Sequence, residues 1–327
     1  MNSDYMTNYL KRIADLDNPL PTDSPFFLPE RPDNPAQEYV AEKKVKKILS
    51  DEEKDELKAL YYKKTGEPAT ETWDRFSSER ITEVLDGKGW VVPGLLTGEE
   101  CEEIIELGED WGIGEEDVKV PRDQRVRTSN RTNSYQNPEL SIRLNKRLPE
   151  ELLEAVEQSA PWTSVRGLHP NWRVARYRSG ETFPAHQDQA DSVIVKHAER
   201  VRQRYTSSHT LLINLTSRGT HFDGGQTRFF MDGDYSGRTV DICLPRGYAL
   251  VFQQRGLYHA GLPVLGDGVK YIAQTGLLRA EPERGVITGP ASVFKYAPGL
   301  SRDSMLKHKS DYNYLLNREA TDAFLKI

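Results

Sequence analysis

The sequence predicts a mainly β protein with flanking helices, an α+β fold whose strands form a sandwich or barrel. The first observation is a set of short runs in which apolar residues recur with a period of two, a spacing typical of half-buried strands. Gly and Pro separate these runs, which cover residues 172–177, 210–216, 228–231, 239–244, 249–252 and 271–278. The second observation is that no regular helical segment alternates with them, which argues against a doubly wound parallel sheet.

Composition and charge restrict the classes of function. The chain has 327 residues, 37% of them hydrophobic and 29% charged, with a net charge of −6. A chain of that length can bury a substantial core, and its net negative charge provides no general attraction to nucleic acid or to an anionic membrane. The start of the chain lacks an apolar signal region, and only two cysteines occur. We therefore expect a cytoplasmic or otherwise intracellular protein with no membrane partner.

Residues 1–75 are expected to form a Pro-rich and helical N-terminal extension. Six prolines lie between residues 19 and 35, so this part is expected to be extended. Residues 39–64 have the spacing of two charged amphipathic helices, and Ser50 with Glu53 predicts a capping box at the start of the second. Two interpretations are open: an arm that binds a partner, or a solvated helical layer packed on the domain that follows. The many charged residues favour the second.

The next segment mixes strand, helix and loop signals. A strand is expected within residues 87–94, followed by a helix that begins at Thr97, where Glu100 completes a capping box. Residues 122–137 are polar and have no apolar period, which predicts a loop. Residues 140–158 return to helical spacing, with Pro149 in the first turn of the second half.

Three residues in the β-rich region have the pattern of a metal site. His186 and Asp188 are two residues apart, so on a strand both side chains point to the same side. His259 must come from another strand that folding brings alongside. Two imidazoles and one carboxylate cover one face of a ferrous ion and leave the opposite face open. Zinc hydrolases also use His and carboxylate ligands, but this set in this order fits Fe(II) better.

Six sequence blocks around these residues resemble one family. In order they are Arg176-Tyr177-x-x-Gly180, His186-x-Asp188, FDGGQTRF at 222–229, PRGYALVF at 245–252, His259-x-Gly261 and Gly268-Val-Lys270. The series resembles the prolyl-4-hydroxylase-type branch of the Fe(II)/2-oxoglutarate-dependent dioxygenases. The resemblance extends back to Gly89 and does not cover the first 75 residues. It implies a double-stranded β-helix (jelly-roll) core, with a dioxygenase domain at 76–285 and a C-terminal tail at 286–327 packed on it.

The resemblance also implies roles for individual residues. His186, Asp188 and His259 would be the metal ligands and the catalytic set. Lys270 would bind the distal carboxylate of 2-oxoglutarate, and Tyr177 and Thr210 would make further contacts with the cosubstrate. Arg127 and Ser129 would lie near the substrate entrance. Arg279 is a rival cation; its odd offset from Lys270 places the two on opposite faces of a regular strand unless a bulge intervenes. Two residues depart from the family pattern: Asn214 replaces a frequent Tyr, and Gln226 replaces a Glu.

The activity that the resemblance implies is hydroxylation of an unactivated C–H, with Fe(II), 2-oxoglutarate and O2, releasing succinate and CO2. Ascorbate would serve as a reductant. The substrate would be a peptidyl, prolyl-like residue or an amino-acid-like small molecule. An oxidative N-demethylase is an alternative, but the acidic charge and the absence of interleaved basic and aromatic residues argue against a nucleic-acid partner. A non-catalytic jelly-roll binding protein is the other alternative, and the complete metal set argues against it.

Overall fold

The computed structural model describes residues 50–113, 129–131, 135–159, 165–197, 201–232, 235–280 and 292–293. Several expectations lie outside these residues: the Pro-rich segment, the first of the two N-terminal helices, Arg127, and the tail at 286–327 apart from 292–293. Four helices are described: α2 (Asp51–Gly66), α3 (Gly98–Asp110), α4 (Pro138–Asn145) and α5 (Glu150–Ser159). Within the described part of the chain, no helix combines the length and the apolar character needed to cross a membrane.

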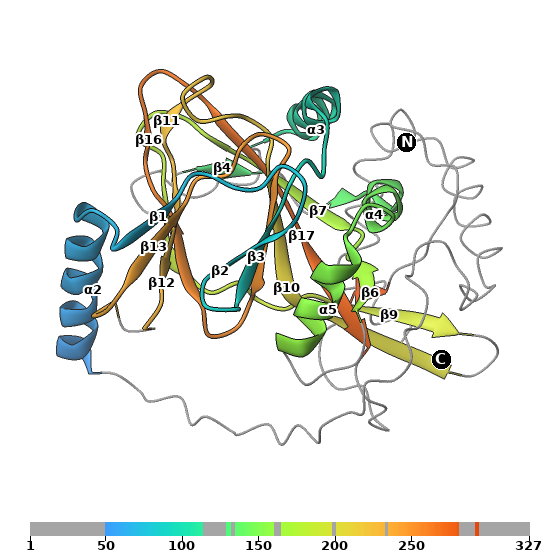
Figure 1. Cartoon of the computed structure of the whole chain (residues 1–327). Helices are drawn as coiled ribbons and strands as arrows, with labels where there is room; N and C mark the ends of the chain where they lie inside the picture. The colour runs from blue at the N-terminus through green and yellow to red at the C-terminus, as the bar shows by residue number, and fades with distance from the viewer. Residues whose placement is uncertain are drawn as a thin grey trace, which may run out of the picture.

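Two β-sheets form the core (Figure 1). The smaller sheet has the order β1 (Glu71–Trp73), β13 (Thr239–Ile242), β12 (Thr227–Phe230), β15 (Tyr258–Gly261) and β8 (Phe183–His186). The larger sheet runs β2 (Thr82–Val84), β3 (Gly89–Val92), β14 (Ala249–Gln253), β10 (Val201–Asn214), β17 (Lys270–Ala280), β7 (Asn171–Tyr177) and β4 (Asn130–Arg131). Branching from it are β5 (Tyr135–Gln136), β6 (Val165–Leu168), β9 (Ser192–His197) and β18 (Ser292–Val293), while β11 (Asp223–Gly224) and β16 (Val264–Leu265) form a separate pair.

The order of the strands along the chain identifies a jelly roll. From β7 to β17 the chain passes from the larger sheet to β8 in the smaller one, back to β10, and then to the β12–β13 hairpin. It returns to the larger sheet at β14, crosses to β15, and ends in the larger sheet at β17. Every pairing among these eight strands is antiparallel. This alternation between two facing sheets confirms the predicted double-stranded β-helix.

Successive residues of β10 show how the larger sheet buries both of its faces. Leu212 points between the two sheets, where it joins Phe252 and Phe229. Leu211 and Ile213 point to the other face, in a cluster with residues of α3, α4 and α5. These three helices lie against that face (Figure 1). Helices therefore cover the outer face of the larger sheet, and its inner face meets the smaller sheet.

Five of the six predicted strands match β7, β12, β13, β14 and β17 within a few residues, and the sixth lies within the longer β10. The predicted helix over residues 140–158 is wrong in one respect, because it is two helices. Asn137 caps α4 by accepting a hydrogen bond from the Leu140 amide (3.0 Å). Pro149 has no N–H to continue that helix, and α5 begins at the next residue.

Helix α2 begins with the predicted capping box: the Glu53 amide donates to the Ser50 hydroxyl (3.1 Å), and the Ser50 amide donates to the Glu53 carboxylate (2.8 Å). The helix runs along the outer side of the smaller sheet (Figure 1). After α2, strand β1 pairs in parallel with β13 and extends that sheet by one strand. Residues 50–75 therefore pack on the β-core, as a helical layer would.

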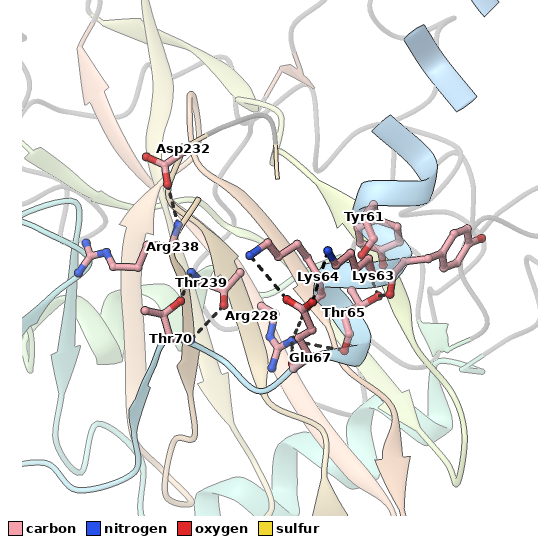
Figure 2. Close-up of polar contacts among 11 residues, drawn as sticks. Tyr61, Lys63, Lys64, Thr65, Glu67, Thr70, Arg228, Asp232, Arg238 and Thr239 are labelled. Carbon is pink, nitrogen blue, oxygen red and sulfur yellow. Dashed lines mark hydrogen bonds and ion pairs between the residues drawn. The ribbon is translucent and has the colours of Figure 1, made fainter. Parts of the chain in front are cut away.

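A buried arginine joins α2 to the smaller sheet (Figure 2). Arg228 on β12 donates through Nη1 to the carbonyl oxygens of Lys64 (2.8 Å) and Glu67 (2.7 Å) at the end of the helix. Its Nε and Nη2 donate to Asp241 on β13 at 2.7 and 2.8 Å. Both charged side chains are buried. One guanidinium thus satisfies helix carbonyls that have no partner inside the helix and holds its counter-ion at the same time.

Replacing Asp241 with Ala should destabilise the protein by about 3–5 kcal/mol, because it leaves the Arg228 charge buried without its carboxylate. Urea unfolding measures the free energy. The matched control is Asp86→Ala, which removes a partner of the partly exposed Arg238. That change should cost less than about 1 kcal/mol. If both variants lowered the free energy of unfolding by the same amount, the buried Arg228–Asp241 pair would matter no more than the exposed one, contrary to the prediction.

Candidate metal centre and cosubstrate site

Antiparallel pairing of β8 and β15 places His186 directly opposite His259. Their rings lie on the same side of the sheet, with centroids 4.3 Å apart. Asp188 follows two residues after His186, and its oxygens lie 3.6 Å from Nε2 of His186 and 3.8 Å from Nε2 of His259. One potential ligand atom from each residue lies within 4.8 Å of the other two. The three predicted ligands therefore converge.

The orientation of both rings leaves the Nε2 atoms for a metal. Nδ1 of His186 lies 2.9 Å from the carbonyl oxygen of Pro184, and Nδ1 of His259 lies 3.4 Å from that of Leu257. A proton on each Nδ1 can be donated to these carbonyls, which fixes the tautomer with a lone pair on Nε2. Burial, opposed by the nearby Asp188 charge, lowers the pKa of His259 to about 4. This imidazole is therefore neutral at neutral pH, the form that binds metal.

Two side chains hold the Asp188 carboxylate in place. The Thr210 hydroxyl donates to Oδ2 at 2.6 Å, and the Gln274 amide donates to the same oxygen at 3.1 Å. Burial acts to raise the pKa of Asp188, but the hydrogen bond from Thr210 and the two neighbouring histidines outweigh it, so the pKa lies below its usual range. The group is thus a carboxylate. Two imidazoles and one carboxylate fit the expected Fe(II) ion.

Aromatic rings enclose the histidines. Phe183 lies with its ring centroid 3.8 Å from that of His186, while Phe252 and Phe229 lie 4.8 and 5.5 Å from His259. His259 is buried and His186 is partly exposed. The rings limit rotation of the imidazoles and keep water from the His259 side of the site.

Lys270 is a buried cation on the inner face of the larger sheet. It is 4% exposed, pairs in register with Tyr177, and lies with Nζ 5.6 Å from the centre of the Tyr177 ring. Nζ donates to the Gly225 carbonyl oxygen at 2.6 Å. Burial lowers the pKa of Lys270 to about 8. Among the described residues no carboxylate forms an ion pair with Lys270, so an anionic ligand would relieve the cost of burying this charge.

Arg279 lies at the far end of β17, nine residues or about 30 Å of extended chain from Lys270. It is fully buried, and burial, opposed by the Glu157 charge, lowers its pKa to about 10. Burial, together with the positive charge of Arg279, lowers the pKa of His209. A register shift between Leu278 and Arg279 interrupts the pairing with β6. Because such an irregularity can change the side on which the next side chain lies, the odd offset between Lys270 and Arg279 does not by itself place them on opposite faces.

The other predicted residues occupy different places. Tyr177 is buried next to Lys270, whereas the Thr210 hydroxyl contacts Asp188. Ser129 is fully buried, and its amide donates to the Thr182 carbonyl oxygen (3.3 Å) just before β8. Arg127 is outside the described residues. The cosubstrate roles of Tyr177 and Thr210 and the substrate roles of Arg127 and Ser129 stay predictions.

Gln274 is the site residue that the sequence did not single out. It shares the inner face of β17 with Lys270, four residues away. That spacing was readable from the sequence, but its contact with Asp188 depends on the fold. Asn214, which departs from the family pattern, donates its side-chain amide to the Leu244 carbonyl oxygen (2.8 Å) and so has a structural partner.

No protein-family model and no curated protein matches the chain. Among solved structures, it is similar to a viral collagen prolyl hydroxylase from Paramecium Bursaria Chlorella virus-1 in complex with 2-oxoglutarate, at 22% identity over 60% of this chain and 99% of that chain, with a TM-score of 0.41. A prolyl-4-hydroxylase from Pseudomonas putida matches at 15% identity over 60% and 96% (TM-score 0.40). HygX from Streptomyces hygroscopicus with nickel, 2-oxoglutarate and hygromycin B bound matches at 15% identity over 61% and 84% (TM-score 0.37). Similarity at this level carries no argument about function, which depends on the residues of the site itself.

A graded loss of metal affinity should follow from substitutions at this site. Asp188→Ala removes a ligand and should abolish Co(II) binding, measured by absorption titration of the full chain. Thr210→Val removes the hydroxyl that orients Asp188 and should weaken binding by roughly 10- to 100-fold. Asp191→Ala is the control, because this carboxylate instead accepts a hydrogen bond from Arg173. Unchanged Co(II) affinity in Thr210→Val would contradict the orienting role.

Proposed function

We propose that this protein is an Fe(II)- and 2-oxoglutarate-dependent dioxygenase of the prolyl-4-hydroxylase type, which hydroxylates an unactivated C–H and releases succinate and CO2. The observation that carries the proposal is the convergence of His186, Asp188 and His259 between the two sheets, where the buried Lys270 shares a strand face with Gln274, a partner of Asp188. Either feature alone has ordinary explanations. A three-residue metal site and a buried cation on the facing inner sides of the two sheets match the needs of a chelating dicarboxylate.

Each residue has a defined task in this reaction. His186, Asp188 and His259 bind the metal and leave coordination positions for other ligands. Lys270 would donate to the distal carboxylate of 2-oxoglutarate. Its ammonium group would then have a negatively charged partner in addition to the Gly225 carbonyl oxygen. Thr210 and Gln274 hold Asp188 ionised and oriented. The bound iron and cosubstrate supply the oxidising chemistry, and the protein supplies position and exclusion of water.

The substrate proposed is a peptide with a prolyl-like residue or an amino-acid-like small molecule, as the sequence resemblance implies. The proposal is tested with the full chain, Fe(II), 2-oxoglutarate and ascorbate against a panel of peptides and metabolites. Mass spectrometry should find a product that has gained one oxygen, with succinate formed in equal amount, and Asp188→Ala should form neither. Loss of a methyl group from a substrate would instead indicate N-demethylation. Absence of both metal binding and succinate would indicate a non-catalytic binding protein.

The cation assignment predicts a specific kinetic change. Lys270→Met keeps the length of the side chain but removes the charge that faces the cosubstrate, so the 2-oxoglutarate concentration for half-maximal succinate formation should rise by at least about 30-fold. Metal affinity should stay close to that of the wild type.

Arg279→Met is the matched control, since it removes the other buried cation of β17. In folded protein it should leave the 2-oxoglutarate requirement unchanged. If Arg279→Met raised the requirement and Lys270→Met did not, the assignment of Lys270 would be wrong.

A further inference from the structure

A cation other than Lys270 lies on the inner face of the larger sheet: Arg173 on β7. Strands β7 and β17 lie side by side (Figure 1), and their register pairs Tyr177 with Lys270 and Arg173 with Gln274. Residues four apart on a strand lie on the same face, so the second pair faces the smaller sheet as the first pair does. Directly paired residues have Cβ atoms about 5 Å apart, which places Arg173 next to Gln274.

Gln274 connects this position to the metal centre. Its side-chain amide donates to Oδ2 of Asp188 at 3.1 Å. Lys270 lies four residues away from Gln274, which is about 13 Å of extended strand. Arg173 is therefore close to a metal ligand and separated from the cation assigned to the cosubstrate.

Exposure to solvent increases along the two strands in the same direction. Tyr177 and Lys270 are each 4% exposed at one end. Arg173 and Gln274 are partly exposed, as His186 is. A substrate that reaches the metal from solvent would therefore have access from the Arg173 end of the strands rather than from the Lys270 end.

Arg173 forms only an exposed ion pair. Its Nη2 donates to Oδ2 of Asp191 at 3.3 Å, and the described part of the chain provides no other hydrogen-bond acceptor for this side chain. The two side chains are 34% and 45% exposed. Ion pairs this exposed contribute little to stability, and a guanidinium has five N–H donors. A ligand can therefore bind Arg173 at little cost to the protein.

The neighbouring Arg176 shows how a structural arginine differs. It lies on the opposite face of β7, where Nη1 donates to both oxygens of Glu109 on α3 at 2.7 and 2.8 Å. The Tyr271 hydroxyl donates to the same carboxylate at 2.6 Å. Arg176 thereby joins α3 to the sheet. The Arg173 contact is longer and more exposed, and it lies on the side of the metal centre.

The main chain of Asp191 is fixed, so its carboxylate can orient Arg173. The Asp191 amide donates to the Ser207 hydroxyl at 2.8 Å, and the Ser207 amide donates to the Asp191 carbonyl oxygen at 2.8 Å. Ser207 is buried, and its hydroxyl donates to Gln254 at 3.0 Å. Asp191 therefore holds the guanidinium by one N–H group and leaves the others for a ligand.

We propose that Arg173 is a specificity-determining residue: its guanidinium binds a carboxylate that the substrate carries close to the carbon to be hydroxylated. A planar guanidinium matches a carboxylate through two parallel hydrogen bonds. The carboxylate has two possible sources, the α-carboxylate of an amino-acid-like molecule and the acidic side chain of a peptide, and matched probes distinguish them. The inference rests on the proposed function, because it assigns the substrate class of that same site.

The test measures probe binding by calorimetry, with the full chain loaded with Co(II) and 2-oxoglutarate in the absence of O2. One set of probes compares N-acetylated amino acids with their amides. The other compares proline-containing dipeptide amides that carry glutamate with the same dipeptides that carry glutamine. In one of the two sets, the wild type should bind an acidic probe roughly 10- to 100-fold more tightly than its neutral counterpart.

Three variants assign that preference to a residue. Arg173→Gln should abolish it while the Co(II) affinity and the 2-oxoglutarate requirement stay unchanged. Arg173→Lys keeps the charge but loses the planar pair of donors, so it should retain part of the preference. Arg178→Gln is the matched control, because Arg178 is an exposed arginine just beyond the other end of β7. It should bind the probes as the wild type does.

The outcomes separate the inference from the function on which it rests. If the wild type binds Co(II) and forms succinate but prefers no acidic probe, or binds no probe, the role of Arg173 is overturned and the proposed function stands. The role is also overturned if Arg173→Gln keeps the preference, or if it raises the 2-oxoglutarate requirement, which would make Arg173 a cosubstrate residue. If the wild type itself binds no Co(II) and forms no succinate, the proposed function falls, and the inference falls with it.

Discussion

The pairing of β8 with β15 is the constraint on which the site depends. Antiparallel register sets His186 opposite His259, and because side chains on paired strands share a face, two residues distant in the sequence lie within reach of one ion. A shift of one residue would send one imidazole to the outside of the sheet. The short β8 cannot guarantee that register alone. Within β8 the ring of Phe183 packs against His186, and Phe252 and Phe229 pack against His259 on the other strand.

The second feature of the site is the charge of Lys270, for which the described residues supply no carboxylate partner. Buried Arg228 has Asp241, and partly buried Arg176 has Glu109. Lys270 has a carbonyl oxygen and an aromatic ring instead, and its lowered pKa reflects the cost. A stable fold seldom buries an ammonium group in this way without another purpose. This contrast with Arg228 and Arg176, which both have carboxylate partners, supports the proposed role of Lys270 in binding an anion.

The sequence was sufficient for most of the core strands and for the pairing of His186 with Asp188, because both depend on local spacing, whereas His259 was included through the family resemblance and the structure places it beside them. Period-two patterns predict strands directly, and the spacing of His186 and Asp188 places both side chains on the same side of a strand. Strand β8 was not predicted, since its four residues include Pro184, which is tolerated at an edge but breaks the strand signal. Gln274 could not be assigned either. Its contact with Asp188 joins residues 86 positions apart, and only the packed structure defines such a pair.

The placement of β1 bears on how the protein can be shortened. This strand covers the edge of β13, and α2 covers the adjoining outer surface. A recombinant fragment limited to the jelly roll would expose the unpaired backbone of β13 beside the ring of Phe230, which Tyr61 of α2 contacts. Open strand edges of this kind pair with other chains, so such a fragment would be prone to self-association. Residues 50–75 therefore belong in any recombinant version of the jelly roll that is to remain monodisperse.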